Sequence, residues 1–152
     1  MKRFFLTLAA MLTAMLAVSA ASLEVINKGE GFEYPLQEGA TIVCYAKRID
    51  GSVDAFKEYN DYFVFKNNKL YSNTMHKIYK PGKAEQLKKV DRVKLNKEGL
   101  LSLYDPLWEW SVRHHMRTIK INTKNGEYYM TGTQDNWMWY RNITATGYCK
   151  VK

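Results

Sequence analysis

The sequence predicts a mainly β fold: a small antiparallel β-barrel, or alternatively a two-sheet sandwich, with one or two short helices and one disulfide. About eight short runs rich in β-branched and aromatic residues are separated by turn signals, which is typical of sandwiches and barrels. Asn125-Gly126 stands between two such runs and is a strong hairpin signal. Cys44 and Cys149 fall in an early run and in the final one, and a covalent tie between them suits a closed sheet.

The first 20 residues predict a secretory signal peptide. Lys2 and Arg3 precede an uncharged apolar run over 4–18, and small residues lead up to the expected cleavage after Ala20. The alternative, an uncleaved membrane anchor, needs a longer apolar segment, and no later run approaches the roughly 18 apolar residues of a spanning helix. Cleavage shortens the chain from 152 to 132 residues and lowers its net charge from +8 to +6. Residues 21–152 are then expected to form one periplasmic or secreted domain.

Export changes the interpretation of the two cysteines. In an oxidising compartment, a pair of cysteines predicts one disulfide, Cys44–Cys149. The alternative is two free thiols. A redox-catalytic role is not expected, because the sequence contains no Cys-x-x-Cys pair.

The start of the domain predicts an irregular arm followed by a hairpin. Residues 21–40 hold three glycines and one proline, which indicate irregular structure with a short strand at 23–26. The β-branched and aromatic run at 41–49 predicts a strand. Asp50-Gly51 then predicts a type I′ turn into a return strand at 52–56.

The middle of the chain predicts another hairpin and an interrupted strand. Runs at 62–66 and 69–79 flank Asn67-Asn68, whose side chains tolerate positive φ and favour a turn. Residues 87–95 alternate less cleanly and predict a strand interrupted by charge. Residues 84–89 are also a candidate for a short charged helix.

A second short helix is expected after Asp105. Asp105 suits the N-cap, Pro106 the first helical position, and Glu109 the first turn, so that a helix would run to about His115. The competing interpretation is a long connecting loop with its tryptophans folded inward.

The last strand, over 137–149, has large residues on both of its faces. Alternation places Trp137, Trp139, Arg141, Ile143 and Ala145 on one face, and Met138, Tyr140, Asn142, Thr144, Thr146 and Tyr148 on the other. One set must therefore be exposed, be covered by another segment, or line a cavity. Either these aromatics fill the core, or they form a ligand cavity or partner surface.

Candidate catalytic groups are few. His114 and His115 are consecutive, so on a strand they belong to opposite faces and do not suit one metal ion. Glu109 lies between Trp108 and Trp110, where a raised pKa would suit an acid catalyst. A helix-terminal glutamate is the simpler interpretation. No nucleophile elbow or phosphate-binding loop is present, and we expect no enzyme, no cofactor and no metal.

A basic stretch suggests anionic partners. Only Glu85, Asp91 and Glu98 oppose the eight cations of this stretch. Outside the cytoplasm such a segment favours lipid headgroups or acidic glycans of the cell envelope, and no motif indicates specific nucleic-acid binding. A solubilising surface is the alternative. The cations are Lys77, Lys80, Lys83, Lys88, Lys89, Arg92, Lys94 and Lys97.

Gly147-Tyr148-Cys149 forms a Gly-x-Cys element near the end of the chain, after the predicted signal peptide and the series of short strands. The chain resembles the broad set of small exported single-domain β-proteins of Gram-negative bacteria, many of them calycin- or lipocalin-like barrels with Gly-x-Cys near the end. The resemblance covers most of the domain and implies a barrel, without indicating a particular family.

These observations lead to one functional expectation and two alternatives. We expect an exported, non-enzymatic binding module that offers an aromatic cleft or a basic face to an anionic or amphipathic ligand or to another exported protein. The alternatives are an exported inhibitor of a host or competitor enzyme, and a hydrolase using His114 or His115 with Glu109. The expected binding residues are Trp108, Trp110, His114, His115, Trp137, Trp139, Tyr140 and Arg141.

Overall fold

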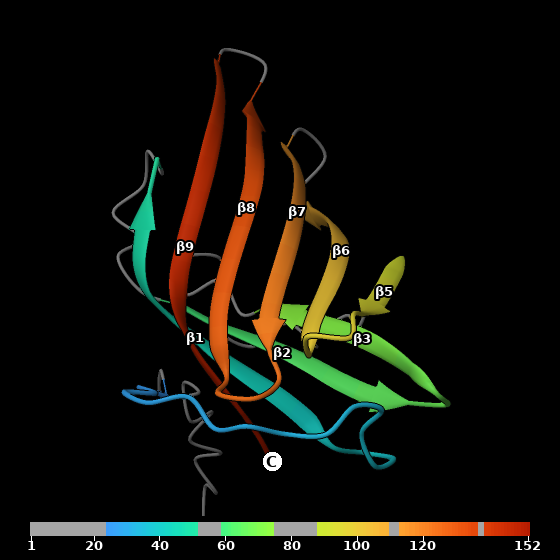
Figure 1. Ribbon diagram of the computed structural model, residues 1–152. Helices are drawn as coiled ribbons and strands as arrows, with labels where there is room; N and C mark the ends of the chain where they lie inside the picture. The colour runs from blue at the N-terminus through green and yellow to red at the C-terminus, as the bar shows by residue number, and fades with distance from the viewer. Residues whose placement is uncertain (1–23, 52–58, 75–87, 110–112, 137–138) are drawn as a thin grey trace, which may run out of the picture.

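The computed structural model describes residues 24–51, 59–74, 88–109, 113–136 and 139–152. The expected signal peptide and the expected return strand at 52–56 lie outside these ranges. The described residues form nine β-strands and no helix (Figure 1). The strands are β1 (Thr41–Asp50), β2 (Tyr59–Lys66), β3 (Lys69–Thr74), β4 (Lys88–Lys89), β5 (Arg92–Leu95), β6 (Leu100–Glu109), β7 (Arg113–Asn122), β8 (Glu127–Asn136) and β9 (Trp139–Val151).

The strands form one antiparallel sheet in the order β4-β3-β2-β1-β9-β8-β7-β6-β5. Its two edge strands, β4 and β5, are consecutive pieces of the chain. Between them the Val90 N–H donates to the Leu70 carbonyl of β3, and the Asp91 N–H donates to the Tyr104 carbonyl of β6. The chain thus crosses from one edge of the sheet to the other, and the sheet curls into a nearly closed barrel. The barrel prediction is confirmed.

The first and last strands of the chain, β1 and β9, pair in the middle of the sheet and carry the disulfide. Cys44 of β1 lies opposite Cys149 of β9, and the two are bonded across 105 positions of sequence. Both are fully buried. The backbone of Cys149 is held as well, since its N–H donates to the Gly126 carbonyl and its carbonyl accepts from the Glu30 N–H. The predicted disulfide is confirmed.

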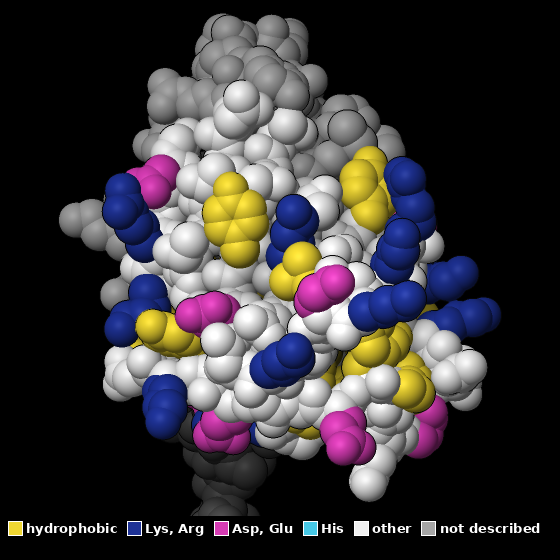
Figure 2. Space-filling view, in the orientation of Figure 1, with side chains coloured by type: hydrophobic (Ala, Val, Ile, Leu, Met, Phe, Trp, Pro, Cys, Tyr) yellow, Lys and Arg dark blue, Asp and Glu magenta, His cyan; other side chains and the backbone are white. Residues whose placement is uncertain are grey.

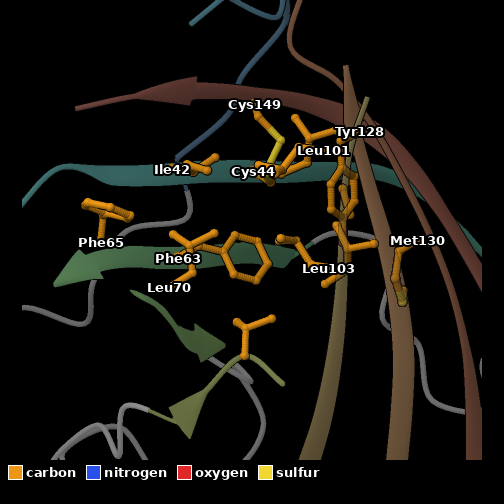
Figure 3. Close-up of a cluster of buried hydrophobic side chains, with 14 of the residues drawn as sticks. Ile42, Cys44, Phe63, Phe65, Leu70, Leu101, Leu103, Tyr128, Met130 and Cys149 are labelled. Carbon is orange, nitrogen blue, oxygen red and sulfur yellow. A yellow bond between two sulfur atoms is a disulfide. The ribbon is translucent and has the colours of Figure 1, made fainter. Parts of the chain in front are cut away.

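The core fills the barrel around this disulfide. Alternation along β1 turns Ile42, Cys44 and Ala46 inward, and all three are fully buried. Figure 3 shows the disulfide together with the apolar side chains that surround it. They include Phe63, Leu101, Leu103, Ile119, Ile121 and Tyr128.

The N-terminal arm closes one end of the barrel and covers part of its outside. Phe32 and Leu36 pack against the core, and the Phe32 N–H donates to the Thr123 carbonyl. Ile26 is buried against the outward-facing Val43 of β1. The arm is irregular as predicted, but the expected strand at 23–26 is absent from its described part, because the arm bonds to turns and strand ends and joins no ladder.

Two of the three predicted hairpins are present. Asn67 and Asn68 both have positive φ (50° and 57°) and join β2 to β3. The Asn125-Gly126 hairpin joins β7 to β8, but it uses a longer turn in which the Gly126 N–H donates to the Asn122 carbonyl at 2.7 Å. Gly126 has φ +70°, and a Cβ there would collide with the Cys149 carbonyl oxygen. Only glycine satisfies both constraints.

The tight hairpin expected at Asp50-Gly51 is wrong. A two-residue turn there would pair Ala46 with residue 55, but Ala46 pairs with Tyr59. The end of β1 instead continues along β9, where Ile49 lies opposite Ala145. An irregularity between Ala46 and Arg48 allows β1 to follow β9 in this way.

The helix expected from Asp105 to His115 is also wrong. Pro106 lies in the middle of β6, opposite Met116 of β7. The Tyr104 carbonyl accepts from the Asp91 N–H, so even-numbered residues of β6 turn their backbone groups toward β5. Because the β5 ladder ends at Tyr104, the missing N–H of Pro106 costs no ladder bond. Proline is tolerated in such an edge position.

The interrupted strand expected at 87–95 is present as β4 and β5, which are separated by Val90 and Asp91. The alternative helix at 84–89 is wrong where it is described, since Lys88 and Lys89 pair with β3. Along β9 the predicted alternation is confirmed where burial is described. Ala145 is buried, whereas Asn142 and Thr146 are exposed.

Removing the disulfide should weaken the fold strongly. In Cys44→Ala/Cys149→Ala, we expect the free energy of unfolding to fall by up to about 4–5 kcal/mol, because the bond closes a loop of about 105 residues in the unfolded chain. Unfolding in guanidinium chloride measures the loss. As a control, a reductant should destabilise the native protein equally and leave the double variant unchanged. An unchanged unfolding midpoint in the double variant would contradict this prediction.

The arm should make stability depend on pH through Glu24. Its carboxylate lies 2.8 Å from the Lys150 ammonium and 2.6 Å from that of Lys152. Burial raises the pKa of Glu24, but the hydrogen bonds and charges of the two lysines outweigh this and lower it. A lowered pKa contributes stability above the ordinary value of about 4.3, and this stability is lost as pH falls through the lowered value.

At pH 7 we therefore expect Glu24→Gln to cost about 0.5–1 kcal/mol, a small value because water reaches this pair. Urea unfolding between pH 7 and pH 3 should show the variant and the native protein converging at low pH. Glu33→Gln, an exposed acid of the same arm, is the matched control. A difference that stays constant down to pH 3 would refute the role of the Glu24 charge.

Candidate functional site

The strand register gathers the expected site residues at one end of β6–β9. Trp108 lies opposite His114, His114 lies opposite Asp135, and Asp135 lies opposite Tyr140. These residues come from four strands and form a single row across the sheet. The sequence could not show this proximity, because it depends on the register of three hairpins.

The neighbouring row contains two more of the expected residues. His115 lies opposite Gln134, which lies opposite Arg141. Adjacent rows belong to opposite faces of a sheet, so the two histidine positions are on different faces, as their spacing predicts. Trp139 lies opposite Asn136. Trp110 and Trp137 lie outside the described residues, as do the side chains of Trp108, His114, His115, Trp139, Tyr140 and Arg141.

A buried polar cluster crosses the barrel interior. It consists of Asp61, Arg117 and Tyr128, which are 0%, 5% and 3% exposed. The Arg117 Nη1 donates to Asp61 Oδ1 at 2.6 Å, and the Tyr128 hydroxyl donates to Asp61 Oδ2. The guanidinium carbon also lies 5.9 Å from the ring centre of Phe63. We call these three residues the Asp61 cluster.

Closure of the barrel creates the Asp61 cluster. Asp61 belongs to β2 and Arg117 to β7, and β1, β9 and β8 lie between these strands in the sheet. The two side chains meet only because the sheet curls. Asp61 was not among the residues expected from the sequence, although it alternates with the apolar Phe63 and Phe65 on one face of β2. An acid at an inward-facing position of an otherwise apolar strand face is the sequence signal that would have indicated a buried ion pair.

The outward side of β5–β9 forms a second candidate site. An open depression of about 490 Å³ lies on it. Figure 2 shows this side, with Lys and Arg side chains among the exposed hydrophobic and aromatic ones. We call it the outer face. The side chains that line its depression include Lys47, Lys120, Asn122, Glu127, Tyr129 and Tyr148.

Cations cover two of the tyrosines of the outer face. The Lys47 ammonium lies 5.8 Å from the ring centre of Tyr148, and the Arg92 guanidinium lies 4.6 Å from that of Tyr104. Tyr129 is 42% exposed. Such contacts between a cation and a ring contribute about 0.5–1 kcal/mol at exposed sites.

Three lysines on or beside this face are not neutralised. Among the described residues, Lys47, Lys94 and Lys120 take part in no ion pair. Lys89 and Lys97, from the basic stretch, are exposed near the edge of the face at β4 and β5. Lys77, Lys80 and Lys83 of that stretch lie outside the described residues, as does the side chain of Lys88.

The register arranges the outer face in rows across the strands. One row, which we call the Tyr129 row, consists of Thr146, Tyr129, Lys120, Ser102 and Lys94, one from each of β9, β8, β7, β6 and β5. The next row on the same face, the Tyr104 row, consists of Thr144, Thr131, Thr118, Tyr104 and Arg92. Neither row contains an acid.

The described part of the chain contains neither a cluster of metal ligands nor a helix that could cross a membrane. Within the described ranges, no three His, Cys, Asp or Glu side chains gather as metal ligands. The same residues include no helix of the length and apolar character that crossing a bilayer requires.

No protein-family model, no curated protein and no solved structure matches this chain. Its function must therefore be inferred from its own residues.

The Asp61 cluster should be important for stability. Asp61→Ala removes the carboxylate that both Arg117 and Tyr128 contact, and we expect a loss of about 3–5 kcal/mol, as for other broken buried ion pairs. Tyr128→Phe removes one buried hydrogen bond and should cost about 1–3 kcal/mol. Urea unfolding measures both losses.

Two further variants make this comparison specific. Asp61→Ala/Arg117→Met removes both charges of the pair and should recover part of the loss, because the Arg117 charge is no longer buried without Asp61. Asp91→Ala, at an exposed acid, should change stability little. If Asp61→Ala is no worse than Asp91→Ala, the buried ion pair does not contribute as we expect.

Proposed function

We propose that this chain is an exported, non-enzymatic binding module whose outer face binds an anionic ligand. The observation that carries the proposal is a set of three cations, Lys47, Lys94 and Lys120, that no acid among the described residues neutralises and that lie beside exposed tyrosine. Lysines at such positions attract anions over several ångströms and raise association rates at low salt.

Two properties of the whole chain support this proposal. Its net charge is +8 for the full sequence and +6 after the expected cleavage, and either value favours anionic partners before any local contact forms. Its disulfide is consistent with an oxidising compartment outside the cytoplasm, in line with the signal peptide that the sequence predicts. Envelope glycans and lipid headgroups are the polyanions that such a protein would meet.

The size of the depression on the outer face is compatible with ligand binding. The depression on the outer face lies within the size range of small-ligand sites, about 300–1,000 Å³. Its lining includes the outward-facing Tyr129 and Tyr148 together with Lys47 and Lys120, and Glu127 is the one acid among its described residues. The side chains on which the hydrolase alternative depends, those of Glu109, His114 and His115, lie outside the described residues.

Charge reversal on the outer face should abolish anion binding. For Lys94→Glu/Lys120→Glu we expect polyphosphate binding to weaken at least tenfold, about 1.4 kcal/mol or more, because two attractive charges become repulsive. Isothermal titration calorimetry at several salt concentrations measures the affinity, which should also fall as salt rises.

Lys66→Glu/Lys69→Glu is the matched control. It changes the net charge by the same amount at exposed positions beside the β2–β3 turn, and we expect less than about a twofold effect from such distant charges. Equal losses in both variants would show that binding follows net charge without the outer face. No binding of polyphosphate by the native protein would refute the proposal.

A further inference from the structure

The uncovered ring of Tyr129 distinguishes one position of the outer face. Cations lie over the rings of Tyr104 and Tyr148, whereas Tyr129 has neither a cation nor an aromatic partner among the described residues. It is also the one exposed large hydrophobic residue on this face within the described ranges. One aromatic platform is therefore open for a ligand.

The neighbours of Tyr129 have a definite chemistry. Thr146 and Lys120 flank it on the adjacent strands, at the strand spacing of about 4.8 Å. Ser102 and Lys94 continue the row. The Tyr129 row thus presents hydroxyl, aromatic, cation, hydroxyl and cation over roughly 19 Å.

The Tyr104 row runs parallel to it at about 7 Å along the strands. Thr144, Thr131 and Thr118 add three hydroxyls, and Tyr104 and Arg92 end the row as a stacked pair. The surface between the two rows is rich in hydrogen-bonding groups, and its charged groups are all positive.

We infer that the anionic ligand is an acidic polysaccharide that crosses β5–β9 with a sugar ring stacked on Tyr129; this inference rests on the proposed function. The C–H groups on one face of a sugar ring carry partial positive charge and pack on the negative face of an aromatic ring. The Thr and Ser hydroxyls donate to and accept from sugar hydroxyls. Lys120 and Lys94 pair with carboxylate or sulfate groups of the chain.

The acid in the depression gives the ligand a direction. Glu127 lies on β8, two residues before Tyr129, and Tyr148 of β9 is directly opposite it. Glu127 repels an acidic group but accepts hydrogen bonds from sugar hydroxyls. The acidic units therefore lie on the side of Lys120 and Lys94, and neutral units lie beside Glu127.

A membrane surface fits the outer face less well. Binding at the lipid interface uses bulky apolar side chains that enter the acyl region. Of the exposed large hydrophobic residues in the described ranges, Val25, Leu95 and Tyr129, only Tyr129 lies in the outward-facing rows, and it carries a hydroxyl. Hydroxyl-bearing rows match a hydroxyl-rich polymer better than a headgroup layer.

The experiment compares ligands and variants by isothermal titration calorimetry on the full-length exported protein. The probes are an oligogalacturonate, a neutral cello-oligosaccharide, polyphosphate, a single-stranded DNA oligonucleotide and phosphatidylglycerol vesicles. We expect the oligogalacturonate to bind more tightly than polyphosphate of equal charge, and the neutral sugar to bind weakly. Stacking supplies the preference over polyphosphate, and charge supplies the preference over the neutral sugar.

Tyr129→Ala should weaken oligogalacturonate binding about fivefold to tenfold through the lost ring contact, and should leave polyphosphate binding nearly unchanged. Tyr129→Phe should retain most of the affinity. Tyr71→Ala, at a partly exposed tyrosine of β3, is the matched control, and circular dichroism confirms that each variant folds.

The outcomes separate the two proposals. If Lys94→Glu/Lys120→Glu abolishes binding while Tyr129→Ala changes nothing, the anion site stands and the stacked polysaccharide is wrong. If DNA or vesicles bind more tightly than the oligogalacturonate and depend on Tyr129, the ligand class is wrong. If no probe binds, the proposed function itself fails.

Discussion

The pairing of β1 with β9 is the constraint on which the rest of the structure depends. These strands lie in the middle of the sheet order and join two parts that would otherwise be separate: β2–β4 on one side and β5–β8 on the other. The Cys44–Cys149 disulfide lies within this junction, at positions that are directly opposite each other. Because the junction brings together residues about a hundred positions apart, its loop closure is costly, and a covalent bond offsets much of that cost.

A second contact acts across the barrel. The Arg117–Asp61 pair connects β7 to β2 through the interior. A buried ion pair contributes little net stability, because both charges lose their hydration on folding. The pair instead distinguishes the closed barrel from an open sheet, because an open sheet would separate the two charges and leave each beside apolar side chains without its partner. The pair therefore favours the closed geometry over other compact arrangements of the same strands. The Tyr128 hydroxyl adds to this preference by occupying the second oxygen of Asp61.

The distribution of acids explains why the outer face stays positive. Glu24 neutralises Lys150 and Lys152 where the arm crosses the barrel, Asp50 pairs with Arg48, and Asp61 is buried with Arg117. Asp50 lies opposite Thr144 at the β9 end of the Tyr104 row, but its charge is paired with Arg48, and the other two acids lie away from both rows. The cations of those rows therefore keep their charge toward solvent, beside the partly exposed ring of Tyr129, which has no cation or ring partner among the described residues. A polyanion with stackable units is the partner that this combination suits.

Features that depend on local backbone preference and on alternation could be predicted from the sequence. They are the Asn67-Asn68 turn, the alternation along β9 and the interrupted strand around Val90. The disulfide could also be predicted, because the sequence predicts export and contains two cysteines. The helix expected at Asp105-Pro106 shows where prediction from local signals fails. Its capping signals involve only neighbouring residues, whereas β6 is a strand because it pairs with β7 along its whole length and has no ladder partner on its other side at Pro106. The tertiary structure alone decided which distant residues meet. Trp108, His114 and Tyr140 share a row, Asp61 meets Arg117, and Tyr129 stands between Thr146 and Lys120. The physical reason is that turn and strand preferences act over a few residues, while register and closure depend on the whole sheet.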